Sequence, residues 1–190
     1  MSNYYIADTH FGHENILAFD GRPFATVEEM ESELIRRWNS VVGKGDYVYI
    51  LGDFCWGKAD EWIRILKRLN GNKVLIRGNH DIKMSEALRK LFADVKDYKE
   101  IKDNGRNVIL CHYPIPLYRH SCDPNCYMLC GHVHNTKENG FLVMWKSHLK
   151  YACRGEGDNR GQIHNVGCMM PWMDYTPRTL DEILEGDRGE

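Results

Sequence analysis

Residues 3–16 read NYYIADTHFGHENI, and this stretch decides how the rest of the chain is interpreted. Its first part, residues 4–7, is apolar and rich in Tyr and Ile, which predicts a buried strand. Asp8 and His10 follow directly. Side chains two residues apart on an extended segment point to the same side, so a carboxylate and an imidazole here can share one metal ion.

The same arrangement of an apolar run followed by polar residues recurs along the chain. Buried strands are predicted at residues 47–51, 73–76, 108–111 and 127–130, with a weaker one at 162–166. Each of the first four ends at residues that can bind a metal, which are Asp53, Asn79 with His80 and Asp81, His112, and His132 with His134. Because ligands of open α/β sheets bind beyond the carboxyl ends of strands, five separate segments are expected to converge there.

Helices are predicted between these strands. Thr26 and Glu29 form a capping box that opens an amphipathic stretch to about residue 42, and Thr179 with Glu182 opens a short last helix. Residues 60–69 and 85–92 also have helical periodicity. The alternation of strands and helices predicts an α/β fold in which helices cover apolar sheets.

The donor set indicates which metals the site would take. It comprises four imidazoles, two carboxylates and one amide, a mixture that suits Mn, Fe, Ni or Zn better than Mg or Ca. Seven ligands exceed one tetrahedral site but suit two cations when one carboxylate bridges them. Such pairs lie about 3.5–4 Å apart and are typical of phosphoryl transfer.

The blocks Asp8-Thr9-His10, Gly52-Asp53, Gly78-Asn79-His80-Asp81, His112 and Gly131-His132-Val133-His134 resemble those of the calcineurin-like metallophosphoesterase superfamily, as found in small single-domain enzymes of bacteria and phages. The resemblance implies a four-layer αββα sandwich of two mixed β-sheets flanked by helices. It further implies that Asp53 bridges the two cations. The implied ligands of the first metal are Asp8, His10 and His134, and those of the second are Asn79, His112 and His132.

The activity implied by this resemblance is hydrolysis of a phosphomonoester or phosphodiester, by attack of a metal-bridging hydroxide on phosphorus. His80 corresponds to a histidine that binds no metal and protonates or stabilises the leaving oxygen. A metal-dependent nuclease is the first alternative. A non-catalytic scaffold built on a phosphoesterase fold is the second, although such proteins lose ligands that this chain keeps.

Residues that contact the substrate are harder to predict. His13 lies just beyond His10 and can either touch substrate or cap the start of a helix. Residues 135–160 mix Gly, Lys, Arg and aromatic residues without a stable period, which predicts a substrate-facing loop. Arg119, Arg154 and Arg160 are candidates for a phosphate contact, because a guanidinium binds phosphate oxygens in pairs.

Bulk properties set further expectations. The 190 residues predict a single domain spanning residues 1–190. A formal net charge of −2 gives no long-range attraction for nucleic acid or membranes, so a small phosphorylated substrate is favoured over nucleic acid. With no export signal or membrane-spanning run, a cytoplasmic protein is predicted. Its oligomeric state stays open.

Seven cysteines, an odd number, are expected to be reduced thiols in that compartment. Neighbouring cysteines in the run Cys122, Cys126 and Cys130 are separated by three residues, which does not match the paired spacing of a structural zinc site. The sequence assigns this cluster no role.

Overall fold

The computed structural model describes residues 1–81, 83–153 and 161–187, and its first half forms a four-stranded parallel sheet. The strands are β1 (Asn3–Ile6), β2 (Tyr47–Ile50), β3 (Asn72–Ile76) and β4 (Asp94–Lys96), in that spatial order. All neighbouring pairs run parallel. Their carboxyl ends therefore meet at one edge.

A second sheet is built from the later part of the chain. It contains β5 (Tyr98–Asp103), β6 (Arg106–Cys111), β7 (Cys126–Cys130) and β8 (Gln162–Asn165), again in chain order. β5 pairs antiparallel with β6, whereas β6, β7 and β8 are parallel. Two sheets with flanking helices agree with the predicted α/β sandwich, and the structure specifies one sheet as parallel and the other as mixed.

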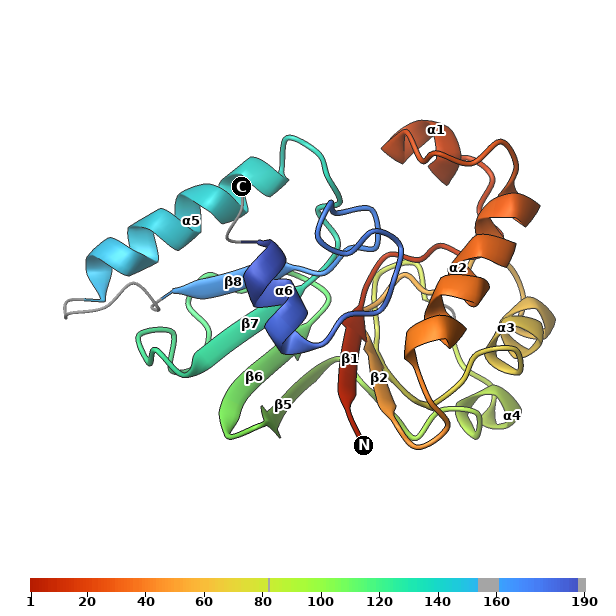
Figure 1. The fold of residues 1–190 in the computed structure, drawn as a ribbon, viewed down its shortest axis with the longest axis horizontal. Coiled ribbons are helices and arrows are strands. Elements are labelled where there is room, and N and C mark those ends of the chain that lie inside the picture. Colours follow the sequence, from red (N-terminus) through yellow and green to blue (C-terminus); the bar gives the residue numbers. More distant parts are fainter. Residues whose placement is uncertain (82, 154–160, 188–190) are drawn as a thin grey trace.

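Helices lie outside the two sheets (Figure 1). The helices α2 (Val27–Val41), α3 (Ala59–Leu66) and α4 (Glu86–Arg89) flank the first sheet, and α5 (Asn139–Ala152) packs along β8 of the second. The short α1 (Ile16–Asp20) stands apart, and α6 (Leu180–Gly186) packs near β1. Apolar side chains such as Trp38 and Trp62 fill the larger core, and a smaller core lies beneath α5.

Several predicted helix starts are present. The Thr26 side chain accepts a hydrogen bond from the Glu29 backbone N–H at the start of α2. At α6, Thr179 and Glu182 cap each other reciprocally, as the sequence predicted. The strands β4 and β5 were not predicted, because both are short or rich in charged residues and β5 buries only alternate positions.

The prediction of an irregular substrate loop at 135–160 is wrong for residues 139–152, which form α5. Leu142 and Leu149 are seven residues apart and bury the same face of this helix in the smaller core. Few other positions of α5 are buried, so its helical period is weak in the sequence. Tertiary packing of this narrow apolar face stabilises the helix.

The segment after β8 closes the free edge of β1. Isolated bridges join Ala7 to Gly167 and Tyr5 to Arg178.

A disulfide joins Cys122, in the loop after β6, to Cys153 at the end of α5. The expectation of seven reduced thiols is therefore wrong for this pair, which the fold brings together from 31 residues apart.

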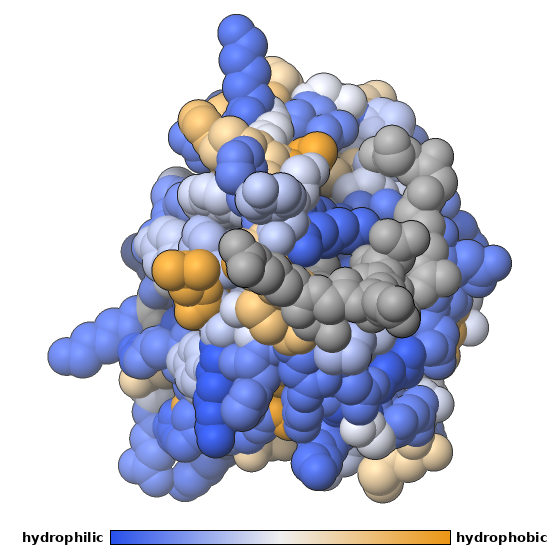
Figure 2. All heavy atoms as spheres, turned by 90° about the vertical axis from the view of Figure 1, so that its left-hand side faces the viewer, coloured by the Kyte–Doolittle hydropathy of each residue, from blue (hydrophilic) through white to orange (hydrophobic). Residues whose placement is uncertain are grey.

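The face that carries α5 is largely hydrophilic, and its apolar patches are small and separated (Figure 2). Across the described ranges, no helix has both the length and the apolar character needed to cross a membrane.

Candidate metal centre

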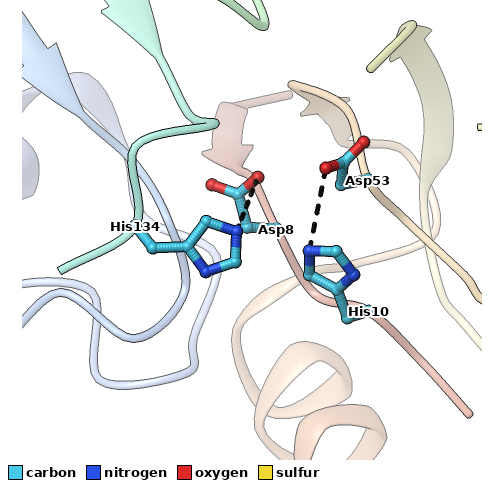
Figure 3. Close-up of side chains that lie close together, drawn as sticks. All are labelled: Asp8, His10, Asp53 and His134. Carbon is cyan, nitrogen blue, oxygen red and sulfur yellow. Dashed lines mark ion pairs between the residues drawn. The ribbon is translucent and has the colours of Figure 1, made fainter. Parts of the chain in front are cut away.

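Four buried side chains converge where the carboxyl ends of the two sheets meet (Figure 3). Asp8 and His10 follow β1, Asp53 follows β2, and His134 follows β7. One potential ligand atom from each lies within 4.8 Å of those of the other three. The predicted convergence of distant segments is thus present for these four residues.

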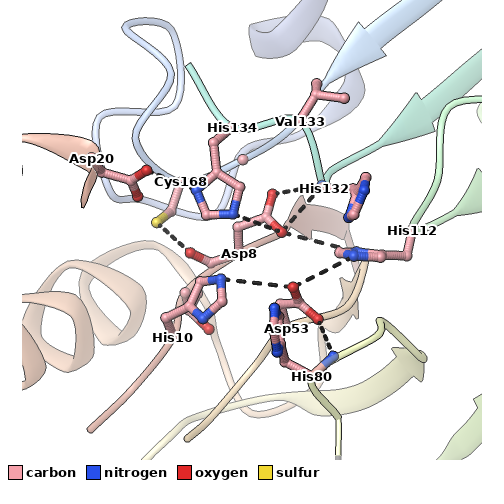
Figure 4. Close-up of polar contacts among 12 residues, drawn as sticks. Asp8, His10, Asp20, Asp53, His80, His112, His132, Val133, His134 and Cys168 are labelled. Atoms are coloured by element: carbon pink, nitrogen blue, oxygen red, sulfur yellow. Dashed lines mark hydrogen bonds and ion pairs between the residues drawn. The ribbon is translucent and has the colours of Figure 1, made fainter. Parts of the chain in front are cut away.

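Three further predicted ligands lie beside this group, and Figure 4 shows two of them, His112 and His132. The Asn79 Oδ1 atom is 3.0 Å from His112 Nε2 and 3.0 Å from His132 Nδ1. Asn79 follows β3, while the two histidines follow strands of the second sheet. These three donors point toward one another, as ligands of a common cation would.

Asp53 lies between the two groups. Its Oδ2 atom is 3.7 Å from His10 Nε2 and 3.5 Å from His112 Nε2. Among the seven predicted ligands, it is therefore placed to be shared by two cations. Its other oxygen, Oδ1, accepts a hydrogen bond of 2.9 Å from the His80 backbone N–H.

The backbone is strained where these ligands lie. Asp8, His10, Asp53, His132 and His134 all have positive φ angles between 48° and 71°. Non-glycine residues adopt such angles uncommonly, at a cost of order 1–3 kcal/mol each. Since five of the nine such residues in the described part of the chain are predicted ligands, the strain is concentrated at the site.

Glycines allow the strand ends to approach one another. A Cβ atom at Gly78 would lie 2.2 Å from Asp53 Oδ1, and one at Gly131 would lie 2.6 Å from Asp8 Oδ2. Any larger residue at either position would displace a predicted ligand. The lack of a side chain at these two glycines therefore allows the strand ends to approach this closely.

Burial disfavours the charged forms of two donors of this site, Asp8 and His10. Burial, followed by the nearby Asp53 carboxylate, raises the pKa of Asp8 to about 7, although His134 partly opposes this. Burial and then the Arg22 charge lower the pKa of His10 to about 2. The buried Nε2 atom of His10 has no hydrogen-bond partner in the described residues. A cation would relieve each of these conditions, so the residues fit a metal site.

Two histidines have their ring nitrogens fixed by neighbours. The Nδ1–H group of His112 donates to the Leu51 carbonyl oxygen at 2.8 Å, which leaves Nε2 free to face Asp53 and Asn79. The Nδ1–H group of His134 donates to Asp20 Oδ1 at 2.7 Å, and Nε2 then faces Asp8. Such outer partners orient metal-binding imidazoles.

Asp20 and Arg22 support the site and were missed by the sequence analysis. The buried Arg22 guanidinium pairs with Asp20 and donates to the backbone carbonyl oxygens of Asp8 and Thr9 at 2.8 and 2.9 Å. Nothing in residues 20–22 differs from a surface turn, so only the fold reveals these contacts.

Asp81 supports the site through the backbone. Its carboxylate accepts hydrogen bonds from the backbone N–H groups of Gly78, Asp53 and Phe54. Burial raises the pKa of this carboxyl to about 6. Asp81 therefore holds the backbone on either side of the site in place.

Five of the seven donors, all except Asp8 and His112, line a cleft of about 690 Å³. His80 lines it, and its ring, exposed to solvent, lies 5.8 Å from that of His10. His13 also lines the cleft, where its ring stacks on Trp56 at 4.2 Å. Both histidines are therefore placed to meet a bound ligand.

Of the arginines predicted to contact phosphate, Arg119 does not line this cleft. Arg119 pairs with Glu100 at 3.0 Å and lines a separate cavity beside β5 and β6. Arg154 and Arg160 lie outside the described residues. The cleft wall is instead completed by residues 136–138, which precede α5.

Comparisons with known proteins agree with this architecture. The model of the calcineurin-like phosphoesterase family matches residues 4–156, and the chain belongs to this family. An uncharacterized protein of Methanocaldococcus jannaschii is 41% identical over 133 residues, which cover 69% of this chain and 68% of that protein. The gene 66 protein of Mycobacterium phage D29 is 29% identical, with 97% and 96% covered.

Among solved structures, a protein of unknown function from Aquifex aeolicus is similar over nearly its whole length. The TM-score is 0.67 at 33% identity, and the match covers 96% of this chain and 97% of that one. The similarity therefore extends to the segment after residue 156, beyond the match to the family model.

Proposed function

We propose that this protein is a dinuclear metal-dependent phosphoesterase that hydrolyses a phosphomonoester or a phosphodiester. The observation that carries the proposal is the meeting of four buried donors within 4.8 Å of one another at the floor of a cleft, with three more donors beside them. A buried group of this kind is costly without a cation.

The seven donors divide between two cations. Asp8, His10 and His134 hold the first, and Asn79, His112 and His132 hold the second. Asp53 is shared, since one of its oxygens lies near a histidine of each group. When bound, two transition-metal ions such as Mn, Fe, Ni or Zn supply an activated hydroxide and offset charge on the phosphate oxygens.

His80 acts on the leaving group in this proposal. Its ring is exposed in the cleft, while its backbone N–H is held by Asp53 beneath it. The backbone bond places the imidazole beside the proposed cations without making it a ligand, and there it would donate a proton to the departing oxygen.

The proposal is tested by assaying purified protein loaded separately with Mn, Fe, Ni and Zn. The substrates are phosphomonoesters, phosphodiesters, nucleotides and short oligonucleotides. We expect metal-dependent hydrolysis of monoesters or diesters and loss of most activity in Asp53→Asn. Hydrolysis restricted to oligonucleotides would favour a nuclease, and no hydrolysis with any metal would favour a scaffold.

The role of His80 is tested by His80→Ala. We expect metal content to be retained, measured by elemental analysis, while kcat falls by about 10²–10⁴-fold. The loss should be largest for esters with poor leaving groups, which need a proton most. Equal activity of both proteins on such an ester would remove His80 from the mechanism.

A further inference from the structure

Three exposed aromatic rings contact histidine rings that belong to the metal centre or lie beside it. Phe19 is 67% exposed, Trp56 44% and Tyr113 46%. The Phe19 ring lies edge-on to His134 at 5.5 Å, Trp56 stacks on His13, and Tyr113 lies 4.5 Å from His132. Single exposed apolar residues are ordinary, but several around one cleft indicate a binding surface.

Phe19 differs from the other two rings because it lines the cleft itself. Its position is fixed by its neighbours: α1 ends at Gly21 in the left-handed conformation, and the adjacent Asp20 is bonded to His134 and Arg22. A large apolar ring is thus held in water beside a predicted metal ligand. It offers a flat, rigid surface to a ligand whose phosphate reaches the metals.

The cleft lining also includes the polar residues Asn15, Thr136, Lys137 and Glu138 and the apolar residues Ile16 and Val133. A cleft of about 690 Å³ is within the range for organic ligands and exceeds what a lone phosphate needs. Aromatic, amide, hydroxyl and carboxylate groups are together suited to a ring with polar edges and a hydroxylated sugar.

The charges of the cleft favour a small molecule over a polynucleotide. Within the described residues, Lys137 is the one lysine or arginine of the cleft lining, and Glu138 lies next to it. The whole chain has a net charge of −2. Binding along a nucleic acid backbone requires a row of cations, which this lining does not provide.

We propose that the substrate is a small nucleotide, with its base stacked on Phe19 and its phosphate ester at the metal centre. This inference rests on the proposed function for the reaction but not for binding. Base stacking on an aromatic side chain is sequence-tolerant, so several nucleotides are accepted. Phe19 is then a specificity-determining residue.

The test compares esters that carry a base with esters that lack one; the first pair differs by the base alone and the second by the whole nucleoside. Adenosine 5′-monophosphate is paired with ribose 5-phosphate, and thymidine 5′-(p-nitrophenyl phosphate) with methyl p-nitrophenyl phosphate. Because stacking contributes about 1–3 kcal/mol per base, kcat/KM should be about 5- to 150-fold higher for the member that carries the base. A value equal for both members of each pair would overturn the proposal.

Variants assign the preference to one ring. Phe19→Ala should raise KM for the nucleotide about tenfold, leave kcat nearly unchanged and leave the base-free ester unaffected. Phe19→Trp should keep the preference. Tyr151→Ala removes an exposed aromatic ring from α5 outside the cleft and should behave as the parent protein. Unchanged nucleotide KM in Phe19→Ala would refute the role of Phe19.

Isothermal titration of the metal-loaded protein with adenosine 5′-monophosphate separates this proposal from the proposed function. Binding that weakens in Phe19→Ala, without hydrolysis of any ester, would support the nucleotide site while refuting the enzyme. Hydrolysis of both members of each pair with equal efficiency would support the enzyme while refuting the nucleotide site. A strong preference for oligonucleotides over mononucleotides would refute the small-molecule substrate.

Discussion

At the residue scale, the carboxylate of Asp20 determines which nitrogen of His134 is available to a metal. It accepts the hydrogen bond of Nδ1 at 2.7 Å and is itself held by the buried Arg22. The hydrogen bond and the nearby Asp8 and Asp20 carboxylates raise the pKa of His134, although burial opposes them. The imidazole is thus oriented and made more basic before a cation binds.

Replacing Asp20 by Asn should weaken metal binding without unfolding the protein. The amide keeps a hydrogen-bond acceptor but loses the charge that supports His134, so we expect Mn affinity to fall by about 10–100-fold in calorimetric titrations. Asp97→Asn, which removes an exposed partner of Arg77, is the matched control and should not change the affinity. Equal affinities in both variants would contradict the role of Asp20.

At the element scale, the site depends on how closely the ends of β1 and β7 approach. Gly131 follows β7 and lies against Ala7 and Asp8, which follow β1. The His132 backbone N–H, next along the chain, donates to Asp8 Oδ2 at 3.1 Å. Two strands from different sheets are therefore joined directly beneath the metal ligands.

Gly131→Ala should destabilise the protein and the site together. Its Cβ atom would lie 2.6 Å from both the Ala7 Cβ and the Asp8 Oδ2, so we expect a loss of about 1–3 kcal/mol in the free energy of unfolding by urea. Gly140→Ala in α5, where a Cβ meets nothing within 4 Å, is the control and should stabilise by about 0.4–1 kcal/mol.

The Mn affinity of these two variants should also differ. It is expected to fall in Gly131→Ala because Asp8 must move, and to be unchanged in Gly140→Ala. If Gly131→Ala bound Mn as tightly as the parent, the contact between the strand ends would not position Asp8.

At the scale of the whole molecule, the site is divided between two sheets. Asp8, His10, Asp53 and Asn79 follow strands of the first sheet, whereas His112, His132 and His134 follow strands of the second. Each proposed cation has ligands from both sheets, so metal binding should hold the two halves of the sandwich together.

Metal binding should therefore stabilise the whole fold. At a free Mn concentration of about 100 times Kd, binding at one site adds about 2.7 kcal/mol, which should raise Tm in thermal denaturation. Hydrogen exchange should slow at the carboxyl ends of strands in both sheets. Asp53→Asn should reduce both effects, and protection confined to one sheet would contradict a shared centre.

The sequence by itself determined the five main strands and the metal-capable residues that follow them. Apolar runs such as residues 47–51 have little alternative to a buried strand. In the fold, the predicted strands are followed by the same metal-capable residues as in the sequence, which are Asp8, Asp53, Asn79, His112 and His134. Local caps such as Thr26 and Thr179 were also predictable, because each depends on residues within one turn.

Only the tertiary structure decided the features that depend on contacts between distant segments. The buried apolar face of α5 comprises only Leu142 and Leu149, too few to give a clear helical period. Asp20 and Arg22 look like residues of an ordinary turn in the sequence. The disulfide joins Cys122 to Cys153, and β7 and α5 lie between them in the chain. The separation of Arg119 from the cleft and the placement of Phe19 within it likewise follow from packing. Periodicity records which residues are buried locally, whereas these positions are set by which strand ends and loops the two sheets bring side by side.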